Sequence, residues 1–275
     1  MTASGQDRAG RTERPPHRRR ASAFIPPQHG AWAFLALPLA LGVTVAPWTP
    51  MLALLAVAWV AAYPMSYAAF GLVRARRPRR FRTPFLVWMA IVLSASAILV
   101  IWRPWLVWVG LAYAGLGLVN LLYARRNDER ALANDAVFIV ECAGMVAVTW
   151  AVTSGERSWS PPGLDTVPDH VWILVVVCAL VLLGSTLHVK SLIRERRDPR
   201  FARASLTVAV ASVPAALALG AWWGWAAGLW LVVPFAVLAA RAFLVPRRSL
   251  RPGAIGVIEL GCFVLVVAAA ILASA

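Results

Sequence analysis

Three short segments hold most of the polar side chains that could bind a ligand in this largely apolar chain. They are PPQHGAW at 26–32, YARRNDERALAND at 123–135 and HVKSLIRERRD at 188–198, and the second leads into an apolar stretch that contains Glu141. Cations, imidazoles and carboxylates in this combination suit an anionic, partly apolar molecule. The candidate binding residues are His29, Arg125, Asn134, Asp135, Glu141, His188, Lys190 and Arg194. No complete catalytic motif stands among them, so no catalytic residue is assigned.

Helical spacing predicts which of these side chains share a face. Asn134 and Glu141 are seven residues apart and Lys190 and Arg194 four apart, so each pair lies on one side of a helix, whereas His188 points elsewhere. Lys190 is the single lysine of the chain, which hints at a specific role for its compact ammonium. Glu141 is the strongest single candidate, because a carboxyl inside a membrane needs a partner or a cavity. A structural hydrogen bond between helices is an equally good explanation for it.

Two further sets of residues inside apolar stretches favour a structural role. Glu259 is expected to snorkel towards the membrane surface or to pair with Arg241 or Arg251. The three cysteines, Cys142, Cys178 and Cys262, are isolated and read as small buried hydrophobes. No metal ligand set or cofactor is identified, and whether Mg²⁺ binds stays open.

The elements that must position these residues are transmembrane helices. The chain has 275 residues, of which 60% are hydrophobic and 14% charged, too few polar residues to cover a soluble globule. Several apolar stretches approach the ~20 residues that cross a bilayer as a helix. They are placed at 31–48, 51–73, 84–102, 104–124, 134–152, 171–189, 204–221, 224–245 and 253–274. This predicts an all-α polytopic bundle of about nine helices. The seventh and eighth stretches are divided at a Gly-Trp cluster, Gly220, Trp222, Trp223, Gly224 and Trp225, whose indoles favour a turn at the membrane surface. An eight-span count is the alternative if the two stretches form one long helix.

Charge and tryptophan fix the predicted orientation. All of the 27 Lys and Arg residues except Arg103 and Arg157 fall in the N-terminal tail or in alternate connections, which the positive-inside rule places in the cytoplasm. The N-terminus is then inside and the C-terminus outside. Most tryptophans gather at the outer boundary as an aromatic belt. The chain is expected in a bacterial inner (cytoplasmic) membrane.

The predicted domains are a disordered basic tail at 1–23 and one transmembrane domain at 24–275. The net charge of +15 is split into short clusters beside the membrane, so lipid headgroups are expected partners and nucleic acid is not. Oligomeric state is not indicated.

Together, PPQHGAW, YARRNDERALAND and HVKSLIRER resemble the YwiC-like bacterial membrane proteins over residues 26 to about 275. That resemblance implies a membrane protein without an assigned activity. A more distant likeness is to the UbiA-type prenyltransferases, and it implies nine helices with a cytoplasmic site where Asp-rich loops hold Mg²⁺ and a prenyl diphosphate. Here the corresponding loops are 74–82, which has no acid, and 190–203, which has Glu195 and Asp198 flanked by arginines. The UbiA-like fold is therefore expected without the metal motifs.

Three functions remain open from the sequence. The first is a cytoplasm-facing pocket that binds an anionic amphiphile such as an isoprenoid or lipid phosphate, whether or not the protein is an enzyme. The second is a small-solute or ion transporter that uses Glu141. The third is a structural or assembly factor of a membrane complex.

Overall fold

The computed structural model describes residues 23–27, 29–128, 131–154, 157–248 and 250–275. Within these residues the chain forms nine α-helices and no strand. The helices are α1 (His29–Val45), α2 (Pro50–Arg74), α3 (Arg79–Trp102), α4 (Leu106–Arg125), α5 (Leu132–Ser154), α6 (Asp169–Val189), α7 (Pro199–Trp223), α8 (Trp225–Leu244) and α9 (Pro252–Ser274). A π-helix, Lys190–Arg194, extends α6, and a 3₁₀ turn, Val245–Arg247, extends α8. The predicted tail falls almost wholly outside the described residues.

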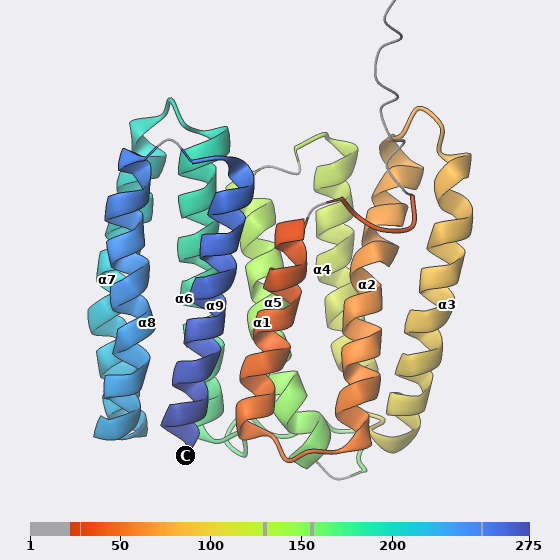
Figure 1. The fold of residues 1–275 in the computed structure, drawn as a ribbon. Helices are drawn as coiled ribbons and strands as arrows, with labels where there is room; N and C mark the ends of the chain where they lie inside the picture. The colour runs from red at the N-terminus through yellow and green to blue at the C-terminus, as the bar shows by residue number, and fades with distance from the viewer. Residues whose placement is uncertain (1–22, 28, 129–130, 155–156, 249) are drawn as a thin grey trace, which may run out of the picture.

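The helices run side by side and alternate in direction, so successive connections lie at opposite ends of the bundle (Figure 1). The described N-terminal segment and the connections α2–α3, α4–α5, α6–α7 and α8–α9 share one end, which we call the Arg-rich end. The C-terminus lies at the other end, which we call the Trp-rich end (Figure 1). The exposed tryptophans in the connections and helix ends on that side are Trp48, Trp102, Trp108, Trp159, Trp222 and Trp225.

Eight helices, α2 to α9, are long and apolar enough to cross a membrane. Helix α1 is apolar but has 17 residues, about 25 Å at 1.5 Å per residue, slightly less than a hydrocarbon core of about 30 Å. The nine predicted helices are confirmed among the described residues, and the chain is a multi-pass membrane protein.

The seventh and eighth stretches are separate helices, as the Gly-Trp cluster predicts, and the fused alternative is wrong. Gly224 interrupts them at φ +156°, a conformation that L side chains rarely adopt. Just before and after this turn, Gly220 and Gly228 bring the two backbones so close that a methyl group on Gly220 would overlap the Cα of Gly228. Small residues at such crossings are typical of membrane helices, where packing replaces the hydrophobic effect.

The apolar core lies where α1, α5, α6 and α9 meet. Its fully buried side chains include Leu41, Val146, Leu174, Val181 and Val266. By contrast, α3 and α4 leave most of their surface uncovered. Helix α6 is therefore the central element of the bundle, and polar groups on it meet several neighbouring helices.

Candidate functional site

Within the part of the chain that the structure describes, ionisable side chains join helices inside the bundle at three places. The first joins α5 to the π-helix after α6, the second joins α4 to α5, and the third joins α6 to α7, α8 and α9. Charged residues inside membrane helices are rare because hydrocarbon cannot solvate them, so each of these places is a candidate site.

The first place is an ion pair between Asp135 and Lys190. Asp135 lies in the first turn of α5, and Lys190, which is almost fully buried, is the first residue of the π-helix. A π-helix widens the helix by one residue per turn and occurs often at functional sites. Here Lys190 stands at its start and contacts α5, while Arg194 at its other end stays exposed and in electrostatic contact with Asp135.

The second place is centred on Glu141, about two and a half turns into α5. Asn120 on α4 donates a hydrogen bond from Nδ2 to Oε1 of Glu141 at 3.0 Å. The hydroxyl of Tyr113, also on α4, donates to the backbone carbonyl of Glu141 at 2.7 Å. The buried carboxyl of Glu141 therefore has a neutral partner, the side-chain amide of Asn120.

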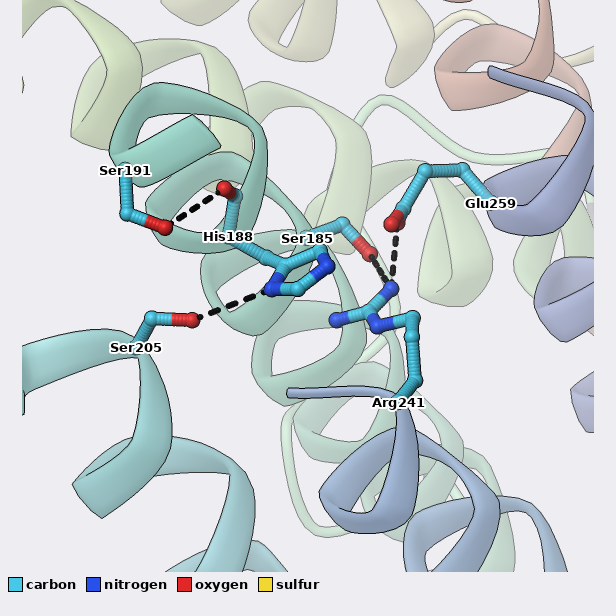
Figure 2. A network of polar contacts seen from close by, with 6 residues as sticks. All are labelled: Ser185, His188, Ser191, Ser205, Arg241 and Glu259. Atoms are coloured by element: carbon cyan, nitrogen blue, oxygen red, sulfur yellow. Dashed lines mark hydrogen bonds and ion pairs between the residues drawn. The ribbon is translucent and has the colours of Figure 1, made fainter. Parts of the chain in front are cut away.

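The third place is a polar network at the Arg-rich end of α6 (Figure 2). Arg241 donates from Nη1 to Oε2 of Glu259 at 2.5 Å and points towards the Oγ of Ser185 at 3.5 Å. The imidazole of His188 lies beside this guanidinium and meets the Oγ of Ser205 on α7 through Nδ1 at 3.4 Å. We call Ser185, His188, Ser205, Arg241 and Glu259 the His188 network.

The structure divides the sequence candidates between these places. Lys190 and Asp135 meet, whereas His188, two residues earlier, faces the other side of α6 and joins the His188 network. Glu141 faces α4. His29 begins α1, but its side chain lies outside the described residues.

The two remaining candidates lie on helices α4 and α5. Arg125 is exposed in the last turn of α4. Asn134 is half-buried near the start of α5.

Several residues of these sites were not among the sequence candidates. Arg241 was counted with the charges of the connection after the eighth stretch, although that stretch, 224–245, includes it. It lies in the last turn of α8 and forms the pair with Glu259 that the sequence offered as one option. Asn120, Ser185 and Ser205 were not singled out. An amide or hydroxyl within an apolar stretch is the signal that could have found them, although serines are common in membrane helices.

The surface at the Arg-rich end holds an open depression of about 840 Å³, lined by residues 193–199. Three exposed arginines, Arg194, Arg196 and Arg197, contribute to it, together with the exposed apolar side chain of Ile193. Asp198 accepts a hydrogen bond from the backbone N–H of Arg200 at 2.9 Å and so caps α7.

Comparison with known proteins adds a family to this architecture. A family model described as YwiC-like protein matches residues 25–150. The uncharacterised protein YwiC of Bacillus subtilis (strain 168) is 30% identical over 256 residues, which cover 89% of this chain and 96% of that protein. The chain belongs to the YwiC-like family.

A second relative of this YwiC-like chain is an uncharacterised protein of Haemophilus influenzae. It is 25% identical over 189 residues, which cover 66% of this chain and 73% of that protein. No solved structure matches the chain. These findings give the UbiA-type likeness no support, so it stays a prediction from the sequence.

Proposed function

We propose that this YwiC-like protein binds an anionic amphiphile, a molecule with a phosphate or carboxylate head and an apolar tail, at its Arg-rich end. The site is the open depression at residues 193–199, and the observation that carries it is the cluster of Arg194, Arg196 and Arg197 there. Guanidinium groups bind phosphate and carboxylate oxygens through paired hydrogen bonds.

The surroundings of the depression suit both ends of such a ligand. The ion pair of Lys190 with Asp135 fixes the π-helix that leads into it, so the arginines project from an anchored segment. Ile193 sits among them, and exposed apolar side chains continue down α7 at Leu206 and Val210. A tail could lie along this surface within the bilayer while the head stays at the arginines. Lys190 then positions the site and does not itself neutralise the ligand.

The positive-inside rule supports a cytoplasmic location for this end, in a bacterial inner membrane. The bound molecule would then enter from the cytoplasm or from the inner leaflet. Lipid phosphates and isoprenoid phosphates share the chemistry of such a head and tail, and the arginines would serve in place of metal-bound acids.

Phosphatidylglycerol added to detergent-purified protein tests the proposal. We expect it to raise the melting temperature of the wild type and to lose this effect in the triple variant Arg194→Gln, Arg196→Gln, Arg197→Gln. The matched control is Arg76→Gln, Arg77→Gln, Arg79→Gln, which removes the same charge from the α2–α3 region of the same end. Equal loss in both variants would indicate general charge attraction and contradict a site at residues 193–199. Phosphatidylcholine should stabilise no variant.

Transport of a small solute or ion is the second candidate, and the buried contact of Asn120 with Glu141 favours it. An acid with a neutral partner can change its charge without breaking an ion pair. Uptake into proteoliposomes that is lost in Glu141→Gln but kept in the triple arginine variant would favour transport over amphiphile binding.

A further inference from the structure

The His188 network contains three buried polar atoms that pair with no other group among the described residues. They are Nε2 of His188, Nε of Arg241 and Oε1 of Glu259, from α6, α8 and α9 respectively. All three side chains are more than nine-tenths buried. Buried polar atoms without a partner are rare, and an ordered water usually explains them.

These atoms belong to one cluster. Figure 2 shows the imidazole of His188 and the carboxylate of Glu259 on either side of the guanidinium of Arg241. Other atoms of the same side chains already have hydrogen-bond partners, since Nδ1 of His188 contacts the Oγ of Ser205 and Oε2 of Glu259 accepts a hydrogen bond from Nη1 of Arg241. The unpaired atoms include a donor, Nε–H of Arg241, and an acceptor, Oε1 of Glu259, and this combination suits a molecule that both donates and accepts hydrogen bonds.

We propose that α6, α8 and α9 form an internal water-binding site here, which completes the hydrogen bonds of His188, Arg241 and Glu259. Water is the small neutral molecule with the matching donors and acceptors, and polar sites of this kind hold two to four hydrogen bonds per water. The inference is independent of amphiphile binding at residues 193–199.

The site exchanges its water through the Arg-rich end. His188 and Arg241 lie in the last turns of α6 and α8, and Glu259 lies about two turns into α9 from the same end. Ser191, whose hydroxyl donates to the backbone carbonyl of His188 at 2.8 Å, extends the polar groups towards that end. The charged group beside His188 is Arg241 of α8. Cys262 of α9 lies beside Arg241 and Glu259, whereas Lys190 forms its ion pair with Asp135 of α5.

Cys262 provides a built-in reporter of this water. It lies one helical turn after Glu259 on α9 and beside Arg241. Cys142 on α5 and Cys178 on α6 are fully buried in the apolar core and serve as matched controls. A thiol proton exchanges with deuterium only where water reaches it, and the S–D stretch that exchange creates is separate from the O–D stretch of D2O and from the other infrared bands of a protein.

The experiment uses full-length variants that each retain one cysteine, with the other two replaced by alanine, in lipid nanodiscs transferred to D2O. We expect the S–D band of Cys262 to appear early and the S–D bands of Cys142 and Cys178 to develop slowly. Exchange at Cys262 as slow as at Cys142, or equally fast exchange at all three, would overturn the proposal.

A second pair of variants tests the part played by His188. In the Cys262-only protein, His188→Phe removes one partner of the water at similar ring size, and we expect slower exchange. His188→Gln keeps a polar group and should exchange faster than His188→Phe. If both variants exchange at the rate of the Cys262-only parent, the assignment of His188 to the site is wrong.

Discussion

The regions around Glu141 and Glu259 each place a glutamate in a membrane helix, but one glutamate has a neutral partner and the other a charged partner. Glu141 accepts a hydrogen bond from the neutral amide of Asn120, whereas Glu259 pairs with the guanidinium of Arg241. In the first region no fixed charge depends on the carboxylate. In the second, each charge depends on the other. We therefore expect the fold to depend on the carboxylate of Glu259 and to tolerate replacement of the carboxylate of Glu141.

The largest effect is expected where one charge of the Arg241–Glu259 pair is removed. Arg241→Met leaves the Glu259 carboxylate buried without a cation and should lower the free energy of unfolding by about 3–5 kcal/mol. The measurement is chemical denaturation of the purified protein in detergent. The double variant Arg241→Met, Glu259→Met replaces the pair by apolar groups and should recover most of this loss. A double variant no more stable than Arg241→Met would show that the pair is not the source of the effect.

The next largest effect is expected where the backbones of α7 and α8 pack closely. A substitution there tests whether the His188 network alone holds these two helices together. Gly220→Ala places a methyl group against the Cα of Gly228, so the helices must separate, and overpacking of this kind costs about 1–3 kcal/mol. Gly117→Ala on α4 is the control, because its methyl group would meet no neighbour. We expect the control to be neutral or slightly stabilised in the same unfolding measurement. Equal free energies of unfolding for the two alanine variants would indicate that polar contacts, and not close backbone packing, hold α7 and α8 together.

Removing the ion pair between Lys190 and Asp135 is expected to lower the free energy of unfolding by an amount between the effects at Glu259 and at Glu141. It is charged like the Glu259 pair, but Asp135 is partly open to solvent, so Lys190→Gln should cost less than Arg241→Met, about 1–3 kcal/mol. Because the pair anchors the π-helix, the variant should also weaken stabilisation by phosphatidylglycerol. A loss of stability without any change in the lipid effect would separate Lys190 from the depression at residues 193–199.

The helices could be predicted from the sequence because they depend on local properties, although α3 and α7 each begin five residues before the predicted stretch. Apolar length defines each span, and the cluster around Gly224 identifies the turn between α7 and α8. Pairing of side chains depends instead on how each helix is rotated about its axis, which no single stretch encodes. Spacing placed His188 and Lys190 on different faces, but it could not show that one meets Arg241 and the other Asp135.

Arg241 illustrates the same limit from the opposite direction. The positive-inside count grouped it with the basic connection after the eighth stretch, since arginine near the end of a span usually reaches the membrane surface. In the structure α8 continues past it, and the guanidinium turns inward to Glu259. The π-helix after α6 is a further feature without a sequence signal, and it changes the direction of every side chain that follows Lys190.

The smallest effect is expected at Glu141, and it is the most direct way to break the comparison. Glu141→Gln keeps an oxygen that can accept the hydrogen bond from Asn120, and no cation loses its partner, so the free energy of unfolding should change by less than about 1 kcal/mol. Glu259→Gln, measured beside it, leaves Arg241 without a carboxylate and should be clearly more destabilising. Similar losses in the two variants would mean that Glu141 carries a charge on which the fold depends, and the region around α4 and α5 would then be as structural as the His188 network. A stable Glu141→Gln that has lost a transport activity would instead show that the acid is retained for function, because packing and hydrogen bonding do not require its charge.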